Sequence, residues 1–115
     1  MNRKERRRLK KSSSHNQENN NSLLEAIKLH TQKNFKTAED LYLKIIKNDK
    51  TNYQALRHLG ILYNDTKRYK QAISYLTDAI HIAPSIPDAH NNLGLVYFVS
   101  DNLALAKKSF EKSFL

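Results

Sequence analysis

The chain has 115 residues with a formal net charge of +9, two glycines, two prolines and no cysteine. The missing cysteines exclude disulfides, thiolate zinc ligands and cysteine nucleophiles, and they fit a reducing compartment. No apolar run approaches the ~20 residues that cross a membrane, and the charged N-terminus has no apolar signal-peptide core. We therefore expect a cytoplasmic protein that is mainly helical, because residues that break helices are few.

Residues 1–22 differ in composition from the rest of the chain. They carry seven Lys or Arg and two Glu, a net charge of +5, and end in a Ser/Asn/Gln-rich stretch. Such a segment has too little apolar surface to fold alone, so we predict a disordered tail before a folded domain at 23–115. The tail could contact nucleic acid or an anionic surface. It lacks aromatic residues for base stacking and an apolar face for membrane insertion, so a solvated tail is favoured.

A self-similarity with a period of 34 residues runs through the rest of the chain. No insertion or deletion is needed to superpose the following side chains: Leu59, Gly60 and Tyr63 on Leu93, Gly94 and Tyr97; Phe35 with Tyr69 and Leu103; Ala38 with Ala72 and Ala106; and Tyr42 with Leu76 and Phe110. A fixed period of this size is typical of helical repeat proteins.

Within each unit, apolar residues recur at helical spacing in two stripes that a polar break separates. We predict helices at 23–33, 36–48, 53–65, 69–82, 87–99 and 103–114. The predicted fold class is all-α: three antiparallel helix hairpins stacked into an α-solenoid, because one hairpin cannot bury its own apolar faces. Gly60 is expected to approach Ala72 and Ala79 of its partner helix, and Gly94 to approach Ala106.

The run from Leu56 to Pro84, with L-x-x-L-G-x-x-Y, A-x-x-x-L-x-x-A and a closing proline, resembles the tetratricopeptide repeat. The resemblance implies a right-handed superhelix that serves as a protein-binding scaffold. It divides the domain into a degenerate repeat one at about 19–52, repeat two at 53–86 and a truncated repeat three at 87–115. Repeat one has Ala26, Leu29 and Lys50 where repeat two has glycine, tyrosine and proline.

Catalytic and cofactor motifs are absent from the sequence. Gly60 and Gly94 are the only glycines, so neither a phosphate-binding glycine loop nor a dinucleotide fingerprint is possible. The five histidines lack the spacing of a metal site, although His58 and His90 could approach one another across adjacent hairpins. We therefore expect a non-enzymatic chain with no catalytic residue, no cofactor and no metal.

The family resemblance also implies a binding surface, because the first helices of such hairpins line a concave groove that holds peptides. The groove residues that it implies here are Ile27, Gln54, Arg57, His58, Ile61, Asn91, Asn92, Leu95 and Phe98. Ile27, Ile61 and Leu95 would form an apolar strip, although Ile61 or Leu95 could instead belong partly to the core. The carboxylate clamp of chaperone-binding members is not expected, because Leu23, Ile27 and Asp88 occupy positions that such a clamp would use.

A second resemblance concerns the segment PDAHNNLG, Pro87 to Gly94, which looks like repeats in the arm of O-linked N-acetylglucosamine transferases. In that family an asparagine ladder grips the substrate backbone, and Asn92 holds the matching position. His58 and Leu24 replace the asparagine in the other two units.

Three functional hypotheses follow. The leading one is a protein-binding scaffold that holds a peptide segment in its groove. The alternatives are the N-terminal targeting arm of a larger enzyme, such as a glycosyltransferase, and a nucleic-acid- or ribosome-associated factor acting through the basic tail. Because the last hairpin ends in apolar Phe110, Phe114 and Leu115 without a covering helix, we expect either that the protein continues past Leu115 or that this end self-associates.

Overall fold

The computed structural model describes the backbone of residues 3–100 and 103–113, and the side chains of residues 17–100, 105 and 107–113. It consists of six helices: α1 (Arg3–Thr31), α2 (Phe35–Asn48), α3 (Tyr53–Asp65), α4 (Tyr69–Ile82), α5 (Pro87–Val99) and α6 (Leu103–Ser113). No strand occurs in these ranges, so the all-α prediction is confirmed. The helices α3, α4 and α5 have the predicted bounds.

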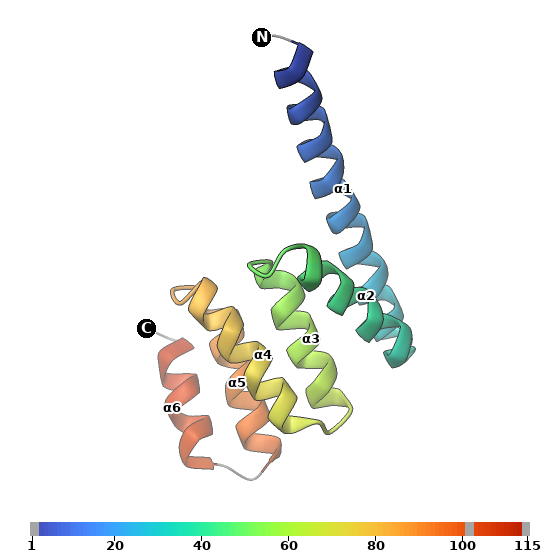
Figure 1. Cartoon of the computed structure of the whole chain (residues 1–115). Coiled ribbons are helices and arrows are strands. Elements are labelled where there is room, and N and C mark those ends of the chain that lie inside the picture. Colours follow the sequence, from blue (N-terminus) through green and yellow to red (C-terminus); the bar gives the residue numbers. More distant parts are fainter. Residues whose placement is uncertain (1–2, 101–102, 114–115) are drawn as a thin grey trace.

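The helices form three antiparallel hairpins: α1 with α2, α3 with α4, and α5 with α6 (Figure 1). Successive hairpins pack through α2 against α3 and through α4 against α5. The first helices α1, α3 and α5 also contact one another in order. They therefore form one side of the stack, which we call the first-helix face.

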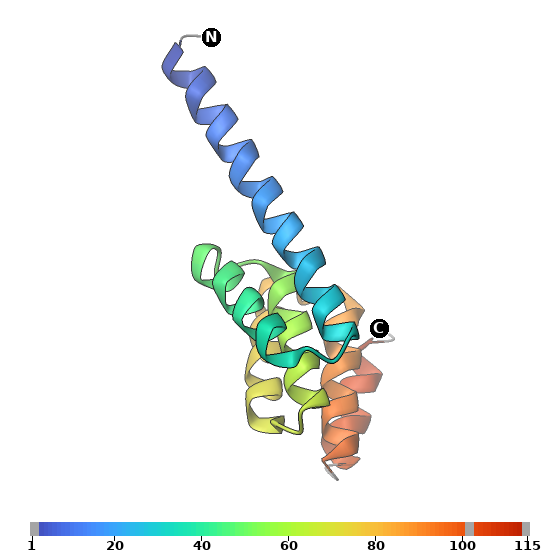
Figure 2. The same cartoon turned by 90° about the vertical axis from the view of Figure 1, so that its right-hand side faces the viewer.

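The structure differs from the sequence prediction at the N-terminus. The first helix begins at Arg3 instead of near residue 23, so the predicted boundary between tail and domain lies within α1. Figures 1 and 2 show the N-terminal half of α1 projecting away from the hairpins. The helix between Leu23 and Thr31 is already nucleated by packing, and each residue added to it gains a backbone hydrogen bond. Arg, Lys and Glu are good helix formers, so the helix continues through this segment.

The turns inside the first two hairpins have the same geometry. Lys33 and Lys67, which are 34 residues apart, both adopt a left-handed backbone with φ of 63°. In each turn the next amide closes the helix end: Asn34 N donates to Leu29 O at 2.8 Å, and Arg68 N donates to Tyr63 O at 2.7 Å. The repeat therefore extends from the helices to the turn conformation.

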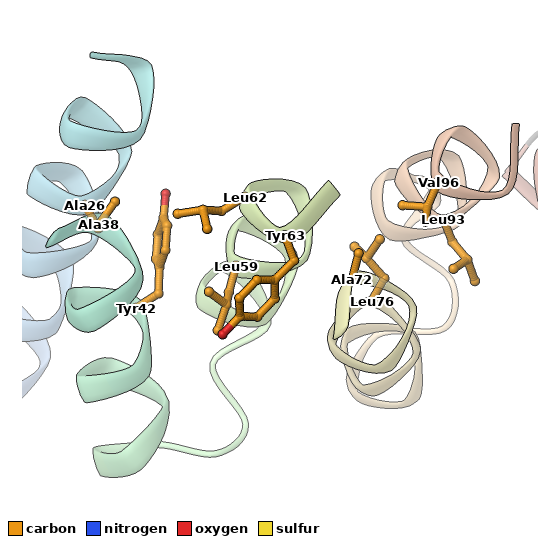
Figure 3. Packing of buried hydrophobic residues seen from close by; sticks show 10 residues of the cluster. All are labelled: Ala26, Ala38, Tyr42, Leu59, Leu62, Tyr63, Ala72, Leu76, Leu93 and Val96. Carbon is orange, nitrogen blue, oxygen red and sulfur yellow. The ribbon is translucent and has the colours of Figure 1, made fainter. Parts of the chain in front are cut away.

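The core runs through all three hairpins. Figure 3 shows Tyr42 of α2 beside Leu62 of α3, and Leu76 of α4 opposite Leu93 and Val96 of α5. A second, smaller cluster contains Leu56, Ala79 and Ala89. Stacked hairpins thus bury the apolar faces that a single hairpin would expose.

Both glycines sit where two helices of one hairpin cross. A Cβ atom added to Gly60 would lie 2.6 Å from Leu76 Cγ and 3.4 Å from the Ala72 carbonyl oxygen. The predicted approach to Ala72 is correct. Leu76, rather than Ala79, is the second neighbour, because Ala79 packs in the smaller cluster one turn further along α4.

At Gly94 an added Cβ would lie 2.8 Å from the Phe110 ring. Phe110 is equivalent to Leu76 in the 34-residue period, so the two hairpins use the same contact. The predicted partner Ala106 and the terminal Phe114 and Leu115 lie outside the described side chains.

Candidate peptide-binding groove

A hollow of about 670 Å³ lies on the first-helix face between α1 and α3. Both helices contribute to it, together with the turn that leads into α2. Its lining residues are Ile27, His30, Thr31, Lys33, Phe35, His58, Ile61 and Asp65. Its floor is therefore apolar and aromatic, with ionisable groups at the edge.

An ion pair closes one end of this hollow. His30 Nε2 lies 2.6 Å from Asp65 Oδ2, which connects the end of α1 to the end of α3. The other ring nitrogen, His30 Nδ1, lies 3.4 Å from the hydroxyl of Tyr42, and the two rings pack edge to face. Burial raises the pKa of Tyr42 to about 12, so its hydroxyl stays protonated. His30 is thus held by groups from two other helices.

His58 lies at the back of the hollow and stacks on Tyr42, with ring centroids 6.2 Å apart and planes within 8° of parallel. Burial, with smaller effects from Arg57 and His30, lowers the pKa of His58 to about 4. At neutral pH the imidazole is therefore uncharged. One ring nitrogen can then accept a hydrogen bond, and the other donates.

Arg57 connects α3 to α5. Its Nη1 donates to Asn92 Oδ1 at 3.2 Å, and its Nη2 donates to Gln54 Oε1 at 3.1 Å. The same Nη2 lies 3.4 Å from His58 Nε2. Arg57 Nε is buried without a hydrogen-bond acceptor among the described residues. Four of the residues that the sequence predicts for the groove therefore form one polar cluster around a guanidinium.

The α5 part of the face is exposed and apolar. Leu95 is 43% exposed, Phe98 57% and Val99 47%. In the 34-residue period these positions correspond to Ile27, His30 and Thr31 of α1, which line the hollow. The exposure of Leu95 excludes the alternative that this side chain belongs to the core.

The nine predicted groove residues fall into three groups. Ile27, His58 and Ile61 line the hollow. Gln54, Arg57 and Asn92 are hydrogen-bonded to one another, with His58 beside them. Asn91, Leu95 and Phe98 are exposed on α5.

Two features differ from the sequence analysis. Asp65, which closes the hollow, is not among the predicted site residues, because its partner His30 lies at a non-equivalent position of the repeat. The possible approach of His58 to His90 does not occur. His58 stacks on Tyr42, and His90 Nε2 lies 2.9 Å from the Pro84 carbonyl oxygen. Among the described residues, no cluster of three or more His, Cys, Asp or Glu could hold a metal ion.

The family assignment rests on repeats two and three. The tetratricopeptide repeat family model matches residues 53–86 and 87–114, which is more than half of the chain. The chain belongs to the tetratricopeptide repeat family. The first hairpin lies outside the matched residues although it has the same architecture, which fits the degenerate first repeat that the sequence predicts.

Similar proteins have longer chains in most cases. The type IV pilus assembly protein PilF of Pseudomonas aeruginosa is 32% identical over 90 residues, which are 76% of this chain and 36% of PilF. This tetratricopeptide repeat chain thus spans about a third of that relative. No described helix is both long enough and apolar enough to cross a bilayer.

Two solved structures show how widely the fold is shared. The second repeat domain of Spaghetti (RPAP3), solved with the HSP90 peptide SRMEEVD, has a TM-score of 0.81 at 19% identity. The match covers 90% of this chain and 96% of that domain. An O-GlcNAc transferase of Thermobaculum terrenum has a TM-score of 0.82 at 21% identity, over 86% of this chain and 19% of the transferase. These likenesses establish the fold.

Proposed function

We propose that this tetratricopeptide repeat chain is a protein-binding scaffold that holds a peptide segment along its first-helix face. The observation that carries the proposal is a continuous series of accessible apolar side chains on this face. Ile27 and Ile61 line the hollow between α1 and α3, and the equivalent Leu95 is exposed on α5 beside Phe98.

The composition of α5 supports this interpretation. One side of the helix is buried through Ala89, Leu93 and Val96, yet the other side is also apolar. A helix that is apolar all round is normally covered on all sides. Large exposed apolar side chains that lie next to one another are typical of interaction sites. The domain of Spaghetti that shares this fold was solved with a bound peptide, which fits the same use of the face.

The proposal is tested with the full chain and a phage-displayed library of random dodecapeptides. Wild type should enrich a family of related peptides. Leu95→Ser should weaken binding of an enriched peptide about tenfold, because an apolar anchor is lost, which corresponds to about 1.4 kcal/mol. Fluorescence anisotropy with the labelled synthetic peptide gives the dissociation constants.

The matched control is Ile82→Ser. Ile82 is exposed to the same 43% as Leu95 but lies at the end of α4, away from the first-helix face. It should leave peptide affinity unchanged. The proposal is wrong if no peptide family is enriched, or if Ile82→Ser weakens binding as much as Leu95→Ser.

A further inference from the structure

The hydrogen bonds around Arg57 determine which groups the centre of the groove offers to a ligand. A guanidinium has five N–H donors and no acceptor. Three of these donors point to Asn92 Oδ1, Gln54 Oε1 and His58 Nε2. Nε is buried and has no acceptor among the described residues, and one hydrogen of Nη1 is also left over. Arg57 therefore has two donors that its described neighbours do not use.

The neighbours of Arg57 are oriented by this arrangement. Asn92 and Gln54 each turn the amide oxygen toward the guanidinium, so their NH2 groups have no acceptor among the described residues. His58 Nε2 can only accept from Arg57, which places the ring proton on Nδ1. All four side chains consequently have N–H groups to donate. A site made of donors around a cation is complementary to a carboxylate.

The carboxylates of the protein nearest to this site do not neutralise it. Asp65 is engaged by His30 at 2.6 Å, at the end of the hollow. Asp88 lies one turn before Asn92 on α5 and is exposed. It forms none of the ion pairs of the described residues. The guanidinium is therefore available to a ligand.

The location of Arg57 distinguishes an internal acidic side chain from a chain end. Arg57 is on α3, the middle helix of the first-helix face. The hollow with Ile27 and Ile61 lies on its α1 side, and exposed Leu95 and Phe98 lie on its α5 side. A peptide that contacts both apolar regions must pass over Arg57 with residues on either side of it.

We propose that the cluster of Arg57, Gln54, His58 and Asn92 is a carboxylate site that selects peptides with an internal Asp or Glu flanked by apolar residues. This inference rests on the proposed groove function and adds a charge preference to it. Charge-assisted hydrogen bonds to a carboxylate are stronger than those to a neutral amide, so the acidic residue contributes selectivity as well as affinity.

The experiment is the dodecapeptide selection followed by sequencing of the bound pool. For wild type, Asp and Glu should be enriched at one internal position between apolar residues. A blocked synthetic peptide with that Glu should bind about tenfold more tightly than its Gln form, a difference of about 1.4 kcal/mol. This ratio should shrink as salt rises, because exposed charges are screened.

Two variants of the full chain test the residues. Arg57→Gln removes the cation, and Asn92→Asp supplies Arg57 with a carboxylate from the protein itself. Both should reduce the Glu-to-Gln affinity ratio from about ten to about one. Lys44→Gln removes an equal charge from the exposed side of α2 and should leave the ratio unchanged. Circular dichroism shows whether each variant is folded, and Asn92→Asp keeps the test decisive if Arg57→Gln unfolds.

The possible failures are distinguishable. Enriched peptides without an internal acidic residue would overturn the carboxylate site and leave the groove function intact. An acidic preference that survives Asn92→Asp and Arg57→Gln would also overturn it. If no peptide is enriched, the proposed function fails and the carboxylate site fails with it.

Discussion

Junction one joins the first hairpin to the second, and junction two joins the second hairpin to the third. In junction one, charged and aromatic groups do much of the joining. Glu39 of α2, only 7% exposed, forms an ion pair with Arg68 at 2.7 Å, and the Arg68 guanidinium lies 4.4 Å from the centre of the Tyr63 ring. The pair of His30 with Asp65 crosses the same junction.

Junction two has a different character. Its centre is aliphatic, with Leu76 of α4 opposite Leu93 and Val96 of α5 (Figure 3). Ala79 and Ala89 lie in the second cluster at the same junction and expose no surface. The same 34-residue plan is thus stabilised by buried polar pairs in one place and by apolar packing in the other. The two junctions should therefore respond differently to substitution and to pH.

The largest expected effect is in junction two. Leu76 is fully buried between Gly60 and α5, so Leu76→Ala should leave a cavity and lower the free energy of unfolding by about 3 kcal/mol. Urea denaturation followed by circular dichroism measures this value. Leu95→Ala is the control: the same atoms are removed from a side chain that is 43% exposed, and the loss should stay below about 1 kcal/mol. Equal losses for the two variants would contradict the aliphatic centre of junction two.

Junction two also shows how far the sequence alone reaches. Leu59, Gly60, Leu76 and their partners recur every 34 residues, so both the apolar core and five of the six helices could be predicted from the period. Equivalent positions have equivalent burial, and this is what a repeat alignment detects.

The polar contacts of junction one could not be predicted in that way. Glu39 corresponds to Ile73 in the next unit, and Arg68 corresponds to Asn34 in the previous one. Each pair joins non-equivalent positions that occur once in the chain, so no periodic signal marks it. The hydrogen bonds of Arg57 were missed for the same reason, although its place on the groove face followed from the family resemblance. The start of α1 was missed because composition alone gave residues 1–22 no packing partner.

The second expected effect is in junction one. Arg68→Met removes the main cation beside the buried Glu39 carboxylate, which then retains only the exposed Lys36, 3.7 Å away. An uncompensated buried charge is costly, so we expect a loss of about 2 kcal/mol in unfolding free energy. Adding Glu39→Gln should recover part of this loss, because it removes the unpaired charge. If the double variant is no more stable than Arg68→Met alone, the pair does not hold the junction together.

The third expected effect is a pH dependence specific to junction one. The folded-state pKa of His58 is about 4, below the value of about 6.5 for an unfolded histidine. Between these values the unfolded chain binds more protons, so the contribution of neutral His58 is complete above pH 6.5 and is lost as pH falls toward 4. After allowance for partial exposure, we expect wild type to lose about 1–2 kcal/mol more than His58→Gln between pH 7.5 and 4.5. Parallel losses in the two proteins, measured by urea denaturation, would contradict this assignment.

The smallest expected effect tests where the hairpins are alike rather than different. Lys33 and Lys67 both have φ of 63°, a left-handed conformation in which a side chain is disfavoured and glycine is not. Lys33→Gly and Lys67→Gly should each raise the unfolding free energy by about 0.5 kcal/mol, because the relief of strain slightly exceeds the added flexibility of the unfolded chain. Lys44→Gly, in the middle of α2, should lower it by about 1 kcal/mol, since glycine disfavours an ordinary helix. Thermal and urea unfolding of the three variants gives the signs. Gains of similar size at both turns would show that the turn geometry belongs to the repeat and is independent of the junction beside it, whereas a gain at only one turn would mean that the neighbouring side chains decide its conformation.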